Sequence, residues 1–211
     1  MRIDRSGLPF IAAAAVPACA AAFWRAPTAA LALASLPAAI ALFFRDPPRT
    51  PPDEPRVVVA PADGRVMHAG DARADEAPPG RWQQVTIFLS VFDVHINRSP
   101  VAGRVTDVRY VPGTFRPAYR HDAHRNEHSE IWLDAGGVAV VVRQVAGLLA
   151  RRVVCRVAPG EVVPRGGRIG LMKFGSRMDV FVPPTATLAV TTGARVRGGE
   201  SVVARLVEGE T

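Results

Sequence analysis

The chain has 211 residues, 48% of them hydrophobic, and a formal net charge of +7. This length can build one substantial domain and an appendage, so it excludes a miniature fold that needs disulfides or metal for stability. The positive charge suits an anionic membrane surface, and the absence of basic runs interleaved with aromatic residues argues against a nucleic-acid partner.

The first part of the chain consists of two uncharged, alanine-rich runs, residues 7–24 and 26–44, separated by Arg25. Each run just reaches the length of a membrane-spanning helix. A cleaved signal peptide is the alternative, because residues 18–20 resemble a cleavage site, but a second apolar run argues against simple secretion. We therefore predict a membrane helical hairpin over residues 1–46. Basic residues flank the pair of runs on both outer sides: Arg2 and Arg5 precede it, and Arg45 and Arg49 follow it. Because positive flanks stay on the cytoplasmic side, we predict that both ends of the hairpin lie in the cytoplasm, at the inner cell membrane.

A proline-rich linker is predicted over residues 47–55, because half of the ten residues from Asp46 to Pro55 are proline. Residues 56–211 then contain short β-type runs separated by glycine-rich turns. We predict a mainly β fold, with a sandwich-like or barrel-like β-domain following the helical hairpin. The expected strands are 56–60, 82–90, 101–111, 130–133, 138–145, 152–157, 178–182 and 201–206.

Three short motifs in this domain carry residue types suited to nucleophilic chemistry. Asp63 follows an apolar strand in Pro-Ala-Asp-Gly, and His95 stands at a strand end in Asp-Val-His-Ile-Asn-Arg. Ser176 follows Gly175 between two strands, where a Gly-Ser pair is by itself most often a turn. Together they form a candidate Asp–His–Ser set, in which histidine can activate the serine hydroxyl.

At these motifs the chain resembles the phosphatidylserine decarboxylase family, in its short, membrane-anchored form. The resemblance runs from about Val57 to Val182. Five segments carry it in order: PADG at 61–64, FLSVFDVHINRSP at 88–100, NEH at 126–128, AGLLARRVVC at 146–155 and FGSR at 174–177.

The resemblance implies a chain that cleaves itself between Gly175 and Ser176. His95, oriented by Asp63, would take the proton of the Ser176 hydroxyl, which would attack the Gly175 carbonyl. The products would be a β-chain, 1–175, and an α-chain, 176–211, held together as a heterodimer. The resemblance also implies that Ser176 becomes a covalent pyruvoyl cofactor, which forms a Schiff base with phosphatidylserine and yields phosphatidylethanolamine.

One departure concerns the histidines. Longer family members carry two histidines in the segment matching 95–98, and here the second position is Arg98. The histidines of the long loop, at 121, 124 and 128, are interpreted as solvated surface residues, with a role in binding the lipid phosphate as the alternative, for His128 above all. Their spacing predicts no metal site, because no cysteine or paired carboxylate supports one.

Arginines are the candidates for binding the lipid phosphodiester, since the guanidinium group pairs well with phosphate. For most of these arginines, the ordinary interpretation is a charged face exposed to solvent. The sequence also leaves open whether the protein forms a homodimer. The predicted substrate-binding arginines are Arg98, Arg116, Arg151 and Arg152.

Two other functional classes compete with this interpretation. A membrane-anchored carrier or adaptor without catalysis is suggested by Pro-Ala-Asp-Gly-Arg-Val, but the one lysine, Lys173, is not in a modifiable turn. A membrane-anchored Asp–His–Ser hydrolase is the third, but Ser176 lacks the nucleophile-elbow pattern.

Overall fold

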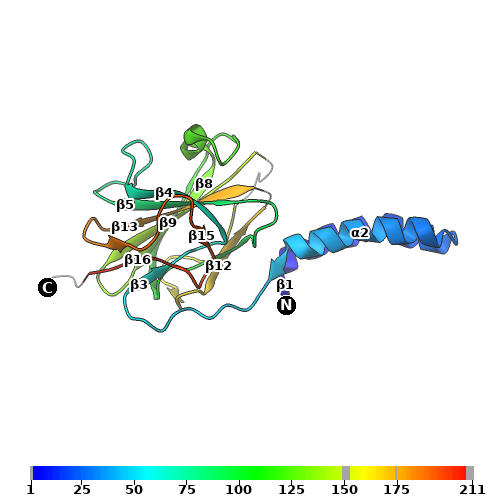
Figure 1. Ribbon diagram of the computed structural model, residues 1–211, viewed down its shortest axis with the longest axis horizontal. Helices are drawn as coiled ribbons and strands as arrows, with labels where there is room; N and C mark the ends of the chain where they lie inside the picture. The colour runs from blue at the N-terminus through cyan, green and yellow to red at the C-terminus, as the bar shows by residue number, and fades with distance from the viewer. Residues whose placement is uncertain (1, 149–152, 174, 208–211) are drawn as a thin grey trace. The chain divides into compact units, whose positions relative to one another are not determined.

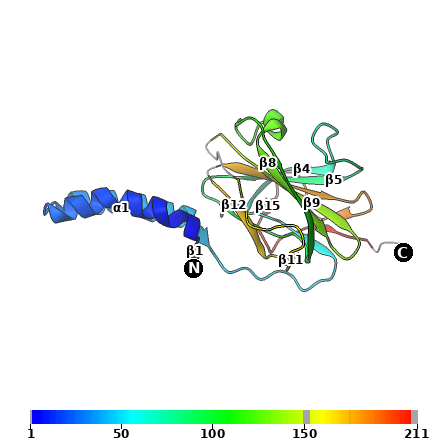
Figure 2. The ribbon, with the colours of Figure 1, turned by 180° about the vertical axis from the view of Figure 1, so that it is seen from behind.

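The computed structural model describes residues 2–148, 153–173 and 175–207, and it divides into two compact units between Pro48 and Arg49. The first unit contains the helices α1 (Leu8–Phe23) and α2 (Pro27–Phe43), which pack against each other (Figures 1 and 2). Each helix starts with proline in its first turn, where the missing N–H is not needed. A short 3₁₀ turn, η1 (Arg5–Gly7), precedes α1, and β1 (Arg2–Ile3) pairs antiparallel with β2 (Arg45–Asp46).

The apolar surface of the first unit is largely uncovered. The stretch Arg5–Phe23 has 19 residues and is long and apolar enough to cross a membrane, whereas α2 is shorter. Length and composition thus qualify one helix as a membrane span. The predicted hairpin with two membrane spans is not confirmed. The structure supports one apolar N-terminal helix that is suited to membrane association.

The second unit is built on an eight-stranded antiparallel sheet that curls into a half-barrel (Figures 1 and 2). Two three-stranded sheets complete the unit. The large sheet has the order β11 (Val162–Val163), β7 (Gly103–Val111), β8 (His128–Asp134), β9 (Ala139–Val145), β13 (Ser176–Val182), β5 (Gln83–Leu89), β4 (Gly64–Asp71) and β15 (Arg195–Val196). The small sheets have the orders β10 (Val153–Cys155), β12 (Arg168–Met172), β6 (Ile96–Arg98) and β14 (Thr187–Leu188), β16 (Val202–Arg205), β3 (Val57–Val59).

Strand β13 lies in the middle of the large sheet and is buried on both faces. Because side chains alternate along a strand, its residues divide into two sets. Met178, Val180 and Val182 belong to the apolar core, and Ser176 shares their face by register. Arg177 and Asp179 point to the other face, which holds a buried polar network.

Each of the eight predicted β-runs overlaps an observed strand, so the mainly β class is confirmed. Sequence reasoning missed β4, β6 and β12, and the two-residue strands β11, β14 and β15. It also missed η2 (His121–Arg125), a 3₁₀ turn in the long loop. The predicted proline-rich linker contacts the β-rich unit over part of its length. Arg49 lies against Asp63 and Glu200, and the carbonyl of Pro52 accepts a hydrogen bond from Arg165, so this segment packs onto the β-rich unit from Arg49 onward.

Candidate functional site

The scissile pair predicted from the sequence lies at the start of β13. Ser176 pairs in register with Leu89, the last residue of β5, and its side chain is fully buried. Its Oγ has no hydrogen-bond partner among the described residues. Gly175 has φ +66°, in the left-handed region that favours glycine. A buried hydroxyl without a structural bond beside a left-handed glycine is available for chemistry.

His95 stands at the end of the turn that joins β5 to β6. The turn leaves β5 beside Ser176 and is held by Asp93, whose Oδ2 accepts hydrogen bonds from the Ser90 amide (2.8 Å) and hydroxyl (2.7 Å). It ends at His95, whose carbonyl accepts from the Met172 amide at 3.2 Å, four residues before Ser176. The imidazole is fully buried, and its Nδ1 lies 2.9 Å from the carbonyl oxygen of Asp93. Donation from Nδ1–H to that carbonyl would leave Nε2 with the lone pair of a base.

Asp63, the predicted partner of His95, has its described hydrogen bonds elsewhere. Its two oxygens accept from Arg49 Nη2 at 2.9 and 2.7 Å, and Oδ1 also accepts from the Gly198 amide at 2.7 Å. The carbonyl of Asp93 is thus the described contact at His95 Nδ1, and an orienting role for Asp63 stays a prediction.

Gly147 is a site residue that sequence reasoning missed, although its motif was noted. An added Cβ on Gly147 would lie 1.8 Å from the carbonyl oxygen of Gly175. The backbone at 147 therefore packs directly on the peptide group that must be attacked. A glycine just beyond a strand is the available sequence signal, because it marks close backbone approach.

Asn126 holds this part of the chain in place. Its Nδ2 donates to the Ala146 carbonyl at 2.8 Å and to the Arg116 carbonyl at 2.7 Å, while Oδ1 accepts from the Arg116 amide at 2.9 Å. The amide of Ala146 donates in turn to the Glu127 carbonyl at 2.9 Å. The long loop 112–127 is thereby fastened to the segment that contacts the Gly175 carbonyl.

A buried ionic network lies on the opposite face of the sheet, behind Ser176. Arg177 pairs with Asp179 (2.8 Å) and with Glu76, which comes from the loop between β4 and β5. Burial alone raises the pKa of Glu76, but Arg177 and hydrogen bonds from Gln84, Arg177 and Arg73 outweigh it, so the pKa is lowered. Glu76 carried no sequence signal, since its loop is rich in alanine and proline and contains none of the motifs.

We expect Glu76→Gln to lower the free energy of unfolding at pH 7 by about 3 kcal/mol, because it removes one of the two carboxylates that pair with the buried Arg177. A lowered carboxyl pKa gives stability that is present above the unfolded pKa and lost as pH falls through the folded pKa. The difference between wild type and variant should therefore shrink below about pH 4.5. Urea unfolding at pH 7 and pH 4 measures this.

The control is Glu54→Gln, which breaks an exposed pair with Arg205. This change should alter the unfolding free energy by less than about 1 kcal/mol. Equal effects of the two variants at pH 7 would contradict a structural role for the buried network.

The remaining predicted residues are dispersed. Arg98 is buried and donates to the Gly166 carbonyl at 3.0 Å, and Arg116, half exposed, pairs with Asp122. Arg151 and Arg152 lie outside the described residues, as does the side chain of His121. Within the described parts of the chain, no group of three or more His, Cys, Asp or Glu side chains could hold a metal ion.

The interpretation of the loop histidines as solvated is wrong for two of them. The His124 side chain is 12% exposed and lies 3.8 Å from Glu76. His128 is buried on β8, and burial is the main cause of its lowered pKa. Its Nδ1 lies 2.8 Å from the Asn126 carbonyl, so this ring is a neutral, structural neighbour of the network at pH 7.

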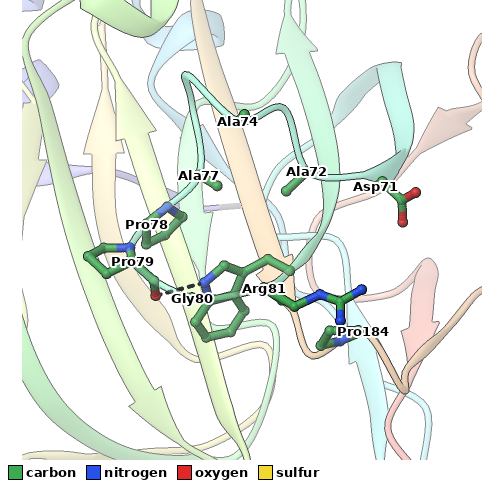
Figure 3. A pocket seen from close by; sticks show the side chains of 10 residues that line it. Asp71, Ala72, Ala74, Ala77, Pro78, Pro79, Gly80, Arg81 and Pro184 are labelled. Atoms are coloured by element: carbon green, nitrogen blue, oxygen red, sulfur yellow. Dashed lines mark hydrogen bonds between the residues drawn. The ribbon is translucent and has the colours of Figure 1, made fainter.

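An open pocket of about 610 Å³ lies beside the loop between β4 and β5, and Figure 3 shows its lining. It is walled by alanine and proline side chains together with Arg81 and Trp82, whose Nε1 donates to the Pro79 carbonyl at 3.1 Å (Figure 3). None of the predicted site residues lines it. The candidate active site is therefore the buried group around Ser176, not this pocket.

Comparisons with known proteins identify the family of the chain. The family model described as phosphatidylserine decarboxylase matches residues 36–204. Relatives named phosphatidylserine decarboxylase proenzyme include one from Symbiobacterium thermophilum, 46% identical over 97% of this chain and 95% of its own. Another, from Solidesulfovibrio magneticus, is 44% identical over 96% of this chain and 95% of its own. A third, from Chlorobium chlorochromatii, is 46% identical over 76% of each chain.

Proposed function

Because the chain belongs to the phosphatidylserine decarboxylase family, we propose that it is a proenzyme that cleaves itself at Gly175–Ser176 and then converts phosphatidylserine to phosphatidylethanolamine. The enzyme is a decarboxylase, and self-cleavage follows from the proenzyme name of its relatives. The observation that carries the assignment of the bond is the fully buried Ser176 Oγ, which has no hydrogen-bond partner in the described chain, next to the left-handed Gly175.

Self-cleavage begins with the loss of the Ser176 hydroxyl proton to His95. The oxygen attacks the Gly175 carbonyl carbon, the peptide C–N bond breaks, and an ester joins Gly175 to Ser176 Oγ. Removal of the Cα proton of residue 176 then expels the Gly175 carboxylate and leaves dehydroalanine. Water adds, ammonia departs, and a pyruvoyl group remains at position 176. The left-handed conformation of Gly175 and the absence of a side chain leave its carbonyl carbon open to attack.

The residues around position 176 fit such a group. The serine hydroxyl has no hydrogen bond among the described residues, so its conversion breaks none of those that hold the fold. Once formed, the group supplies an electrophilic carbonyl for the substrate amine and an electron sink when carbon dioxide departs. His95, which is also fully buried and follows the turn that leaves β5 beside Ser176, is the group we assign to hold and return the proton.

The two products have reason to stay together as a heterodimer. After cleavage the α-chain, 176–211, begins with β13, which pairs with β5 on one side and β9 on the other. Arg177, next to the new terminus, remains paired with Glu76 of the β-chain. Separation would uncover both faces of a fully buried strand.

Substrate and location follow from chemistry around the site. Arg116 is the best placed of the proposed phosphate ligands, because its side chain is half exposed in the loop that Asn126 fastens to Ala146. Arg98, His128, Arg151 and Arg152 remain weaker proposals. The two apolar helices, with Arg2 and Arg5 before them and Arg45 after them, support an inner-membrane enzyme with the β-rich unit in the cytoplasm.

The decisive experiment is the intact mass of the detergent-solubilised protein, followed by an assay for carbon dioxide released from phosphatidylserine. We expect two polypeptides, 1–175 and 176–211, the smaller lighter by one ammonia than a serine-terminated fragment. A single full-length chain without activity would refute the proposal and favour a carrier or adaptor.

His95→Gln should slow self-cleavage by about 100-fold or more, because the general base is lost. Asp63→Asn should slow it by about tenfold if Asp63 helps to orient His95. Cleavage of newly synthesised chain, followed over time on a gel, measures both rates.

The matched control is Glu200→Gln. Glu200 shares Arg49 with Asp63, at 3.2 Å, but belongs to none of the motifs. If Asp63 serves only to hold Arg49, the Asp63 and Glu200 variants should slow cleavage equally. That result would remove Asp63 from the catalytic set.

A further inference from the structure

Four large apolar side chains are exposed on the loops around Ser176. Phe92 is 81% exposed, Tyr119 61%, Leu148 54% and Val91 44%. Burying such side chains is strongly favourable, and a cluster of them in the open marks a surface that contacts something else. We call these four residues the rim patch.

The contacts of their neighbours bring these residues to one place. Val91 and Phe92 follow Leu89, the residue paired with Ser176. Tyr119 packs edge-on against Phe88, with ring centroids 6.1 Å apart. Leu148 follows Gly147, which approaches the Gly175 carbonyl and lies close to Ala118. Three loops that are distant in sequence therefore bring exposed apolar side chains to the neighbourhood of the scissile bond.

The chemistry of this surface suits the interface of an anionic bilayer. Aromatic and aliphatic tips enter the headgroup region, and arginines beside them are attracted to anionic lipids. The loop that carries Tyr119 also carries Arg116, Arg120 and Arg125, against two acids, Asp122 and Glu127. The side chain of Arg120 is 60% exposed.

We propose that the rim patch inserts into the membrane that holds the substrate and passes the lipid headgroup to Ser176. This inference rests on the proposed function: the reacting groups are fully buried, and the acyl chains must stay in an apolar medium while the headgroup enters. A bilayer is favoured over a protein partner because the same chain carries a helix suited to cross one.

Spin labels on the full-length protein in phosphatidylglycerol-containing vesicles test the insertion directly. In a Cys19→Ser, Cys155→Ser background that still self-cleaves, a nitroxide is attached at Phe92→Cys or Leu148→Cys. The control is Val162→Cys on β11, which is 68% exposed and lies at the other end of β7 from the Tyr119 loop. Labels at 92 and 148 should favour collision with oxygen over a water-soluble nickel complex. Equal exposure to nickel at 92, 148 and 162 would overturn the proposal.

Activity gives the second measurement. For the double variant Phe92→Ser, Leu148→Ser, the ratio of turnover on phosphatidylserine in vesicles to turnover on monomeric dihexanoyl phosphatidylserine should fall by about tenfold or more. Val162→Ser should leave this ratio unchanged. An unchanged ratio in the double variant would overturn the proposal. A wild type that is uncut and inactive on both substrates would refute the proposed function instead, while the spin labels would still report the docking.

Discussion

Replacement of Ser176 by alanine is expected to leave one uncut chain, 1–211, without decarboxylase activity. The change removes the oxygen that attacks the Gly175 carbonyl and the atoms from which the cofactor is made. The fold should survive, because the hydroxyl is buried with no hydrogen-bond partner among the described residues. Loss of an unsatisfied buried polar group is close to neutral, so the change in unfolding free energy should stay within about 1 kcal/mol.

Ser129→Ala provides the matched control. Ser129 is another buried strand serine, on β8, paired with Gln144. Its alanine variant should be cut and active like wild type. Gel analysis of both variants, with thermal unfolding to show that each is folded, measures the difference. Two fragments from the Ser176 variant would place the cleavage elsewhere and refute the assignment.

The sequence was sufficient for the parts of the fold that local patterns determine. Alternation of apolar residues predicts β13 within two residues at its start, and the apolar run at 138–145 predicts β9 within one. Strand β4 was missed because Asp63-Gly64 indicates a turn, whereas Gly64 has an extended backbone that places it against Phe88. Glycine is the residue that both a turn and a close contact between strands require, so Gly64 alone does not distinguish the two.

The candidate site divides in the same way. Ser176 and His95 stand in dense motifs, so their local sequence identifies them, and the fold buries both. Contacts between residues far apart in the sequence could not be predicted from local motifs. Nothing near Glu76 predicts its pairing with Arg177, 101 residues away, and nothing near Asp63 predicts its contact with Arg49. Long-range pairing depends on sheet order, which a single sequence does not specify.

Gly147→Ala is expected to slow self-cleavage by about 100-fold, one of the largest expected effects after that of Ser176→Ala. A Cβ at 147 would lie 1.8 Å from the Gly175 carbonyl oxygen, far inside van der Waals contact. Either the segment 146–148 or the scissile peptide must move. Displacement of a reacting group by about 1 Å can cost about 100-fold in rate. Pulse-labelling and gels would follow the cleavage rate.

A clash with a carbonyl would also disturb the fold, so the test needs a variant with the same clash elsewhere. Gly103→Ala meets this need, because its Cβ would lie 2.3 Å from the Asp134 carbonyl oxygen at the far end of β7. Both variants should lose stability by about 1–3 kcal/mol from overpacking, but only Gly147→Ala should be cut slowly. Equal cleavage by the two folded variants would mean that Gly147 merely packs. Selective slowing at Gly147 would show that its backbone positions the Gly175 carbonyl for attack.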